Sequence, residues 1–224
     1  MSNHFVDSLL YKIITYIYAF FTTNVLFVLS NIVLIIVIFE TSMVGTWLFL
    51  FIGFLPLGPA LGALFYSMGK LVREGDISPV KAYARGYVVN FKIAFCFGLI
   101  QSLIFASLAV NLGIIFDTFW MAILFMLLIA LLLMISLYGF AILSRFEMKL
   151  KNLCLISIYT TFKRWPTTLY NFIVSAFFLI LINIIPAYIL PFFASTYVYW
   201  IMRNLKKTLA DLEDEKNKSD DKEH

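Results

Sequence analysis

The polar side chains that lie in the most apolar surroundings of this chain are neutral amides. An amide donates and accepts hydrogen bonds without carrying charge. At membrane depth such a group either packs helices together or lines a path for an uncharged solute. The candidates are five amides from long stretches that contain no Asp, Glu, Lys, Arg or His: Asn24, Asn31, Gln101, Asn111 and Asn183.

Catalytic chemistry within the apolar stretches has few groups to use. A membrane hydrolase needs an activated nucleophile, a metal cluster or a pair of carboxylates. The two histidines, His4 and His224, lie at the chain ends, and no carboxylate falls within the stretches. The sequence also lacks His-Glu-x-x-His, Gly-x-Ser-x-Gly and a phosphate-binding glycine loop. We therefore expect no enzyme, no cofactor and no metal site.

The elements that hold these amides are predicted to be membrane helices. Of the 224 residues 62% are hydrophobic and 13% charged, and the mean hydropathy is +0.93. A helix needs about 20 apolar residues to cross a bilayer. Five stretches free of charge and histidine reach that length: 13–39, 41–69, 93–116, 118–144 and 165–202. The fold class expected is an all-α, polytopic membrane helix bundle.

The basic residues indicate how often the chain crosses the membrane. All 17 Lys and Arg residues fall in 1–15, 70–92, 145–164 and 203–224, and none in the turns at Glu40 and Asp117. Cytoplasmic loops are rich in Lys and Arg, so both termini are expected in the cytoplasm. That requires an even number of crossings, for which Pro186 and Pro191 must divide the last stretch in two. We expect about six transmembrane segments, or five without that division.

The chain is expected to have three parts. Residues 1–15 are predicted to form either an interfacial helix or the start of the first span. Residues 16–202 are predicted to form the transmembrane domain, and residues 203–224 a charged cytoplasmic tail with a solvated, disordered end. Within the transmembrane domain, spans are predicted near 16–39, 44–68, 93–116, 119–143 and 168–185, followed by a short return near 188–202.

Small residues and prolines mark the expected helix contacts. Pro56 and Pro59 each remove a backbone donor, so the second span is expected to kink or break there. Such a break either exposes carbonyls as a transporter site or only improves packing. Small residues let backbones approach closely. They recur at Gly58 and Gly62, and in a small-residue ladder formed by Ala94, Gly98, Ser102 and Ala106.

Two basic connectors lie between the spans on the predicted cytoplasmic side. In the first, Gly75 is expected to end a helix and Pro79 to begin an amphipathic one. Its apolar face would hold Val80, Tyr83, Ala84, Tyr87 and Val88, and would rest on anionic headgroups. No nucleic-acid motif accompanies the charges. The candidates for docking a partner are Arg73, Arg85, Arg145, Glu147 and Arg164.

Several short motifs carry a family resemblance. They are Gly58-Pro59-Ala60, Ala63-Leu64-Phe65-Tyr66, Arg73-Glu74, Arg85-Gly86-Tyr87, Asn90-Phe91-Lys92 and Ser144-Arg145-Phe146-Glu147. With these motifs the chain resembles the YesL family of bacterial integral membrane proteins, which has no established activity. The resemblance implies a bacterial cytoplasmic membrane location and suggests a role linked to sugar uptake.

Two functions are compatible with these features. The first is transport, as a permease-like body or as an accessory subunit of another membrane transporter, for an uncharged solute such as a sugar. The second is a membrane scaffold or regulatory protein that docks a partner through the basic connectors. Lipid attraction accounts for the connector charge under either function, so charge alone does not separate them.

Overall fold

The computed structural model describes residues 2–39, 55–115, 119–184 and 191–220, and these residues form helices without a strand. The helices are α1 (Ser2–Ser30), α2 (Ile32–Phe39), α4 (Leu57–Glu74), α5 (Pro79–Val89), α6 (Phe91–Ile115), α7 (Phe119–Leu143), α8 (Leu150–Lys163), α9 (Trp165–Ile184) and α11 (Phe193–Asp220). The all-α class is confirmed. Within the described ranges, four helices are long and apolar enough to cross a membrane by length and composition: 10–30 of α1, 91–108 of α6, all of α7 and all of α9.

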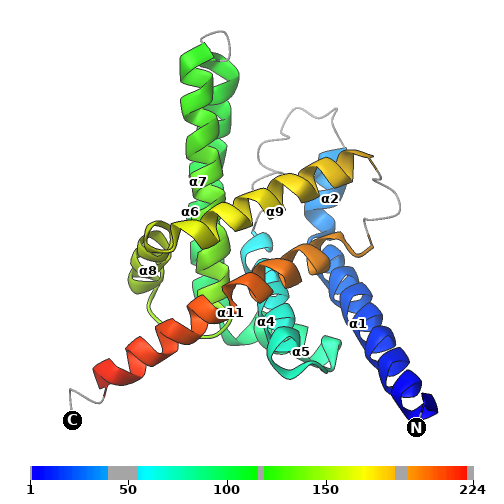
Figure 1. Cartoon of the computed structure of the whole chain (residues 1–224). Helices are drawn as coiled ribbons and strands as arrows, with labels where there is room; N and C mark the ends of the chain where they lie inside the picture. The colour runs from blue at the N-terminus through cyan, green and yellow to red at the C-terminus, as the bar shows by residue number, and fades with distance from the viewer. Residues whose placement is uncertain (1, 40–54, 116–118, 185–190, 221–224) are drawn as a thin grey trace.

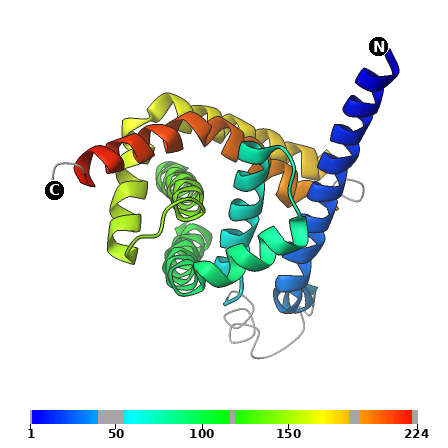
Figure 2. The same cartoon turned by 90° about the horizontal axis from the view of Figure 1, so that it is seen from below.

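The helix α4 forms the centre of the bundle. It packs against α5, α6, α7, α11 and α1, and Figure 2 shows these helices around it. Small residues along α4, such as Gly58 and Ala63, let these neighbours approach. Its large side chains complete the core, where the Phe65 ring stacks on Phe140 with ring centroids 6.0 Å apart.

The long apolar helices present most of their side chains outward. The hairpin of α6 and α7 projects beyond the other helices (Figure 1), and Trp120 and Leu127 on α7 are among its most exposed side chains. An exposed apolar surface of this extent needs hydrocarbon around it. The chain is therefore a membrane protein built as a helical bundle.

The termini of the helices follow local sequence signals. Gly75 adopts a left-handed φ of 78° and its N–H bonds to the Leu71 carbonyl at 2.9 Å, which ends α4. Pro79 occupies the first turn of α5, as expected. The interfacial helix and first span predicted on either side of residue 15 form one helix, since α1 continues without a break to Ser30.

The predicted second span is described only from residue 55 onward, where α4 begins at its prolines. Pro56 stands at the N-cap of α4 and Pro59 in its first turn. The first intrahelical hydrogen bond there runs from the Ala60 N–H to the Pro56 carbonyl. Pro59 precedes that donor, so its missing N–H costs the helix no hydrogen bond. The prolines begin α4 rather than kink it. Residues 44–54 of the predicted span lie outside the described residues, as do residues 185–190 near the predicted final turn, so the count of six stays a prediction.

Two surface predictions need comment. In α5 the buried residues are Pro79, Ala82, Tyr83 and Gly86, because α4 covers the face that holds the small residues. Of the face predicted to rest on headgroups, Tyr83 is therefore buried in the protein, whereas Val80 and Val88 are exposed, so their contact with headgroups stays a prediction. The expected disordered end of the tail is helical, since α11 runs to Asp220. Leu205 and Leu209 of α11 are buried in the bundle core.

Candidate functional site

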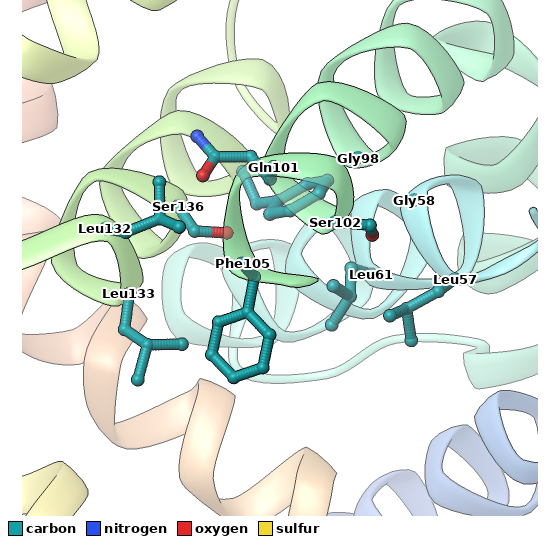
Figure 3. A pocket seen from close by; sticks show the side chains of 11 residues that line it. Leu57, Gly58, Leu61, Gly98, Gln101, Ser102, Phe105, Leu132, Leu133 and Ser136 are labelled. Carbon is teal, nitrogen blue, oxygen red and sulfur yellow. The ribbon is translucent and has the colours of Figure 1, made fainter. Parts of the chain in front are cut away.

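A cavity of about 220 Å³ lies between α4, α6 and α7 (Figure 3). The cavity forms where the backbones of α4 and α6 touch: a Cβ atom added to Gly98 would lie 2.5 Å from the Gly58 Cα. Phe140 of α7 packs edge-on against Phe97, with centroids 5.2 Å apart. The lining is mostly apolar and consists of Leu57, Gly58, Leu61, Gly98, Gln101, Ser102, Phe105, Leu132, Leu133, Ser136 and Phe140.

Three polar side chains interrupt this apolar lining. Gln101 extends from α6 toward α7, on which Ser136 lies, while Ser102 stands nearer the α4 side (Figure 3). The Gln101 Oε1 atom is buried and has no hydrogen-bond partner among the described residues. A buried acceptor left unpaired costs about 1–3 kcal/mol. The cavity lining therefore contains one neutral amide and two hydroxyl groups, and the buried oxygen of that amide is an acceptor without a partner among the described residues.

The other predicted amides lie elsewhere. The backbone N–H of Ala194 donates to Asn24 Oδ1 at 3.1 Å, which joins α1 to the start of α11. Asn31 donates to the Phe27 carbonyl at 2.8 Å, at the junction of α1 and α2. Asn111 and Asn183 each donate to a carbonyl four residues earlier, at 2.7 Å, on their own helices. The five amides therefore do not line one path, and only Gln101 reaches the cavity.

The small-residue ladder divides into two halves. Ala94 and Gly98 are buried against α4, and a Cβ added to Gly58 would lie 2.4 Å from the Ala94 carbonyl oxygen. Gly62 lies against the same turn, with 3.2 Å between its added Cβ and the Ala94 Cβ. Ser102 lines the cavity, whereas Ala106 is exposed. The ladder packs α6 on α4 along its first two turns and then leaves that contact.

The basic connectors are partly occupied by the chain itself. Arg145 and Arg164 form ion pairs with Glu213 and Asp211 on α11, and Lys163 pairs with Glu215 at 3.2 Å. Partial burial, together with repulsion from Arg145, lowers the pKa of Arg73. Arg85 and Glu147 are exposed. Arg145 and Arg164, two of the five predicted docking residues, are therefore engaged within the fold.

Sequence reasoning missed Ser136 and the acidic face of α11. Ser136 shares the signal that singled out the amides, a neutral polar group in a charge-free stretch. Several residues of the family motifs prove to join helices. Asn90 donates to the Leu143 carbonyl at 2.9 Å, and Gly86 lies so close to Tyr66 that an added Cβ would be 2.7 Å from the Tyr66 Cβ.

Comparison with known families gives one match. Residues 20–112 are similar to a family described as a protein of unknown function, DUF624. This segment reaches from the middle of α1 into α6 and includes α4 and Gln101. The match is consistent with the resemblance to the YesL family. Comparison with curated proteins and with solved structures gives no match.

Proposed function

We propose that the protein binds a small uncharged solute in the cavity between α4, α6 and α7, as a permease-like body or accessory subunit of a membrane transporter. The observation that carries this proposal is the buried, unpaired Gln101 Oε1 within an otherwise apolar cavity. A hydroxyl or amide of the solute would complete that hydrogen bond. Mostly apolar pockets with a few convergent polar groups are the usual form of ligand sites.

The size and chemistry of the cavity narrow the solute class. Sites for drug-sized ligands occupy roughly 300–1,000 Å³, whereas this cavity is about 220 Å³, so a small polyol, amide or part of a sugar suits it. None of the lining residues named above is charged. We accordingly propose that the cavity binds a neutral solute and does not catalyse a reaction. Proton-coupled transport is not proposed, because it needs a relay of ionisable residues.

The proposed orientation places the connectors and both chain ends in the cytoplasm of a bacterial cell. In Figure 1 the helical ends near both termini, the α4–α5 turn and the α7–α8 connection lie toward one side, and the C-terminal end of α6 and the N-terminal end of α7 lie on the other. All 17 Lys and Arg residues belong to those termini and connections. The positive-inside rule supports this orientation.

The test compares two buried amides that differ in their distance from the cavity. Gln101→Leu and Asn31→Leu each remove an amide whose oxygen is buried and unpaired among the described residues. Thermal unfolding of the purified protein is measured with and without neutral polyols, sugars and amides. We expect Gln101→Leu to keep or raise the melting temperature and to abolish any solute-dependent rise. Asn31→Leu should retain that rise.

The second readout is solute uptake in cells. A deletion strain is complemented with each variant at matched protein abundance, and its uptake of the neutral solutes is measured. Arg85→Ala serves as a control on the exposed connector. Loss of uptake in Arg85→Ala, with full uptake in Gln101→Leu, would contradict solute binding in the cavity. That ranking would instead support the scaffold function through the basic connectors.

A further inference from the structure

A second, larger hollow lies on the bundle surface between α9 and α11, and we call it the aromatic groove. Its volume is about 620 Å³ and its lining is almost wholly apolar, with Phe177, Phe178, Phe192 and Phe193 among its residues. The helices α9 and α11 lie side by side in Figures 1 and 2. The groove opens on the flank of α9, one of the helices able to span the membrane.

The two helices run antiparallel, which gives the groove a direction. Phe178 of α9 packs against Phe193 with ring centroids 5.7 Å apart. Further along, Ser175 is 2.8 Å from the Tyr197 hydroxyl, and Asn204 donates to the Asn171 side-chain oxygen at 2.6 Å. Residue numbers on α11 therefore rise as those on α9 fall. The four phenylalanines lie at one end of the groove, and Tyr170 and Trp200 lie at the other.

The Tyr170 and Trp200 end of the groove has the composition of a membrane interface. Tyr170 and Trp200 are 43% and 41% exposed, and these residue types gather where hydrocarbon meets headgroups. The guanidinium of Arg203 lies 5.5 Å from the centre of the Trp200 ring. Lys207 follows Trp200 by seven residues, about two helical turns, and so occupies nearly the same face of α11.

The groove is inclined to the α6–α7 hairpin, since α9 and α11 cross the direction of that hairpin at a steep angle in Figures 1 and 2. Along the chain, α11 runs from the phenylalanine end of the groove toward the side that holds the C-terminus (Figure 1). Phenylalanines at one end, Tyr170 and Trp200 at the other, and basic residues beyond them follow the order of chain, glycerol and phosphate in a phospholipid.

We infer that the aromatic groove binds an acyl chain of an anionic phospholipid whose phosphate pairs with Arg203 and Lys207. This lipid site is separate from the solute cavity, because none of its lining residues is shared with that cavity. One basic residue near a membrane surface favours an anionic lipid about fivefold, equivalent to about 1 kcal/mol. The two basic residues and the shaped groove together would select the lipid over its zwitterionic counterpart.

The experiment uses Trp200 as the reporter. Trp47, Trp120 and Trp165 are replaced by Phe, which leaves Trp200 as the single tryptophan of the full chain. The protein is placed in phosphatidylcholine bilayers that contain a minor fraction of brominated phosphatidylglycerol or, at the same fraction, brominated phosphatidylcholine. Bromine quenches tryptophan on contact. We expect the brominated phosphatidylglycerol to quench Trp200 at least fivefold more effectively, with saturation.

Three further variants locate the effect. Arg203→Ala should lower the preference for phosphatidylglycerol about fivefold. Lys206→Ala removes the same charge about 120° around the helix from Trp200 and should leave the preference unchanged. Thr196→Phe fills the groove without changing charge and should remove the preference. This third variant keeps the test decisive if Arg203→Ala does not fold.

Equal quenching by the two brominated lipids would overturn the inference, because the groove would then be ordinary lipid-facing surface. Equal losses in Arg203→Ala and Lys206→Ala would also overturn it, since diffuse surface charge would account for both. Retention of the preference in Thr196→Phe would show that no chain enters the groove.

Discussion

Replacing Gly98 by alanine should push α4 and α6 apart at the point where their backbones touch. The new Cβ would lie 2.5 Å from the Gly58 Cα and 3.2 Å from the Gly58 nitrogen. Carbon atoms in contact prefer a separation of about 3.5–4.0 Å, so the helices would have to separate by about 1 Å. No rotamer change relieves this clash, because the neighbouring atoms belong to the backbone.

The expected magnitude combines two opposing effects. Alanine favours a helix over glycine by about 0.8–1.0 kcal/mol, and overpacking a well-filled contact costs about 1–3 kcal/mol. A clash with backbone belongs at the upper end of that range. We therefore expect Gly98→Ala to lower the free energy of unfolding by about 2 kcal/mol. For a chain of this length that corresponds to a fall of roughly 4–8 °C in melting temperature.

Two other glycines of α4 supply matched controls. At Gly62 the added Cβ meets the Ala94 Cβ at 3.2 Å, which requires a shift of only a few tenths of an ångström. At Gly69 it meets the methyl group of Met202 at 2.6 Å, which is the flexible end of a long side chain. Both substitutions should leave the melting temperature within about 2 °C of the parent, since helix propensity offsets a mild contact.

The assay is thermal unfolding in a mild detergent, with a double variant to test the contact itself. Gly58→Ala should be at least as damaging as Gly98→Ala, because its Cβ would meet the Ala94 carbonyl oxygen at 2.4 Å. Gly58→Ala combined with Gly98→Ala should cost less than the two single losses together, since the first substitution already separates the helices. If Gly98→Ala unfolds no lower than Gly62→Ala, the two backbones do not touch and the packing described for α4 is wrong.

Three further outcomes are expected. Arg145→Gln, which removes the ion pair with Glu213, should destabilise α11 by up to about 1 kcal/mol, and by less at high salt. Amide hydrogen exchange in α11 should then become faster. In the control variant Arg85→Gln, at an exposed site, the exchange in α11 should not change. Burial raises the pKa of Tyr83, so the folded state binds more protons than the unfolded state above pH about 10. The contribution of Tyr83 to the free energy of unfolding is therefore fully present below that pH and is lost as the pH rises further. Tyr83→Phe should flatten the resulting fall in alkaline unfolding curves. Reporter fusions after residues 92, 151 and 207 should all read cytoplasmic, and an external reading after residue 207 alone would indicate five spans.

Local signals in the sequence predicted much of the fold. The charge-free stretch that predicted a span over 119–143 corresponds to α7 residue for residue. Gly75 and Pro79 mark helix ends because their effect depends on their own backbone dihedral angles and missing donors. These effects do not depend on residues far away in the chain, so they can be predicted from the local sequence.

The candidate site was less predictable, because an amide within a helix has two ways to satisfy its hydrogen bonds. Asn111 and Asn183 donate to carbonyls on their own helices, and Asn24 accepts from the start of α11. Gln101 keeps a buried, unpaired oxygen beside a cavity. Composition and spacing are alike for all of them. Only the arrangement of α4 and α7 around α6 distinguishes an amide that lines a cavity from one that bonds to a helix.

The helix α11 shows why the docking hypothesis also needed the structure. Its Asp and Glu residues looked like a solvated tail because local criteria count charge and ignore distant partners. The partners are Arg145, Lys163 and Arg164, which lie 47–68 residues earlier in the chain. A cytoplasmic protein that sought Arg145 and Arg164 would have to displace Glu213 and Asp211, which the chain holds at high effective concentration. Solute binding at Gln101, as proposed, requires no such displacement, and neither does docking at the exposed Arg85 and Glu147.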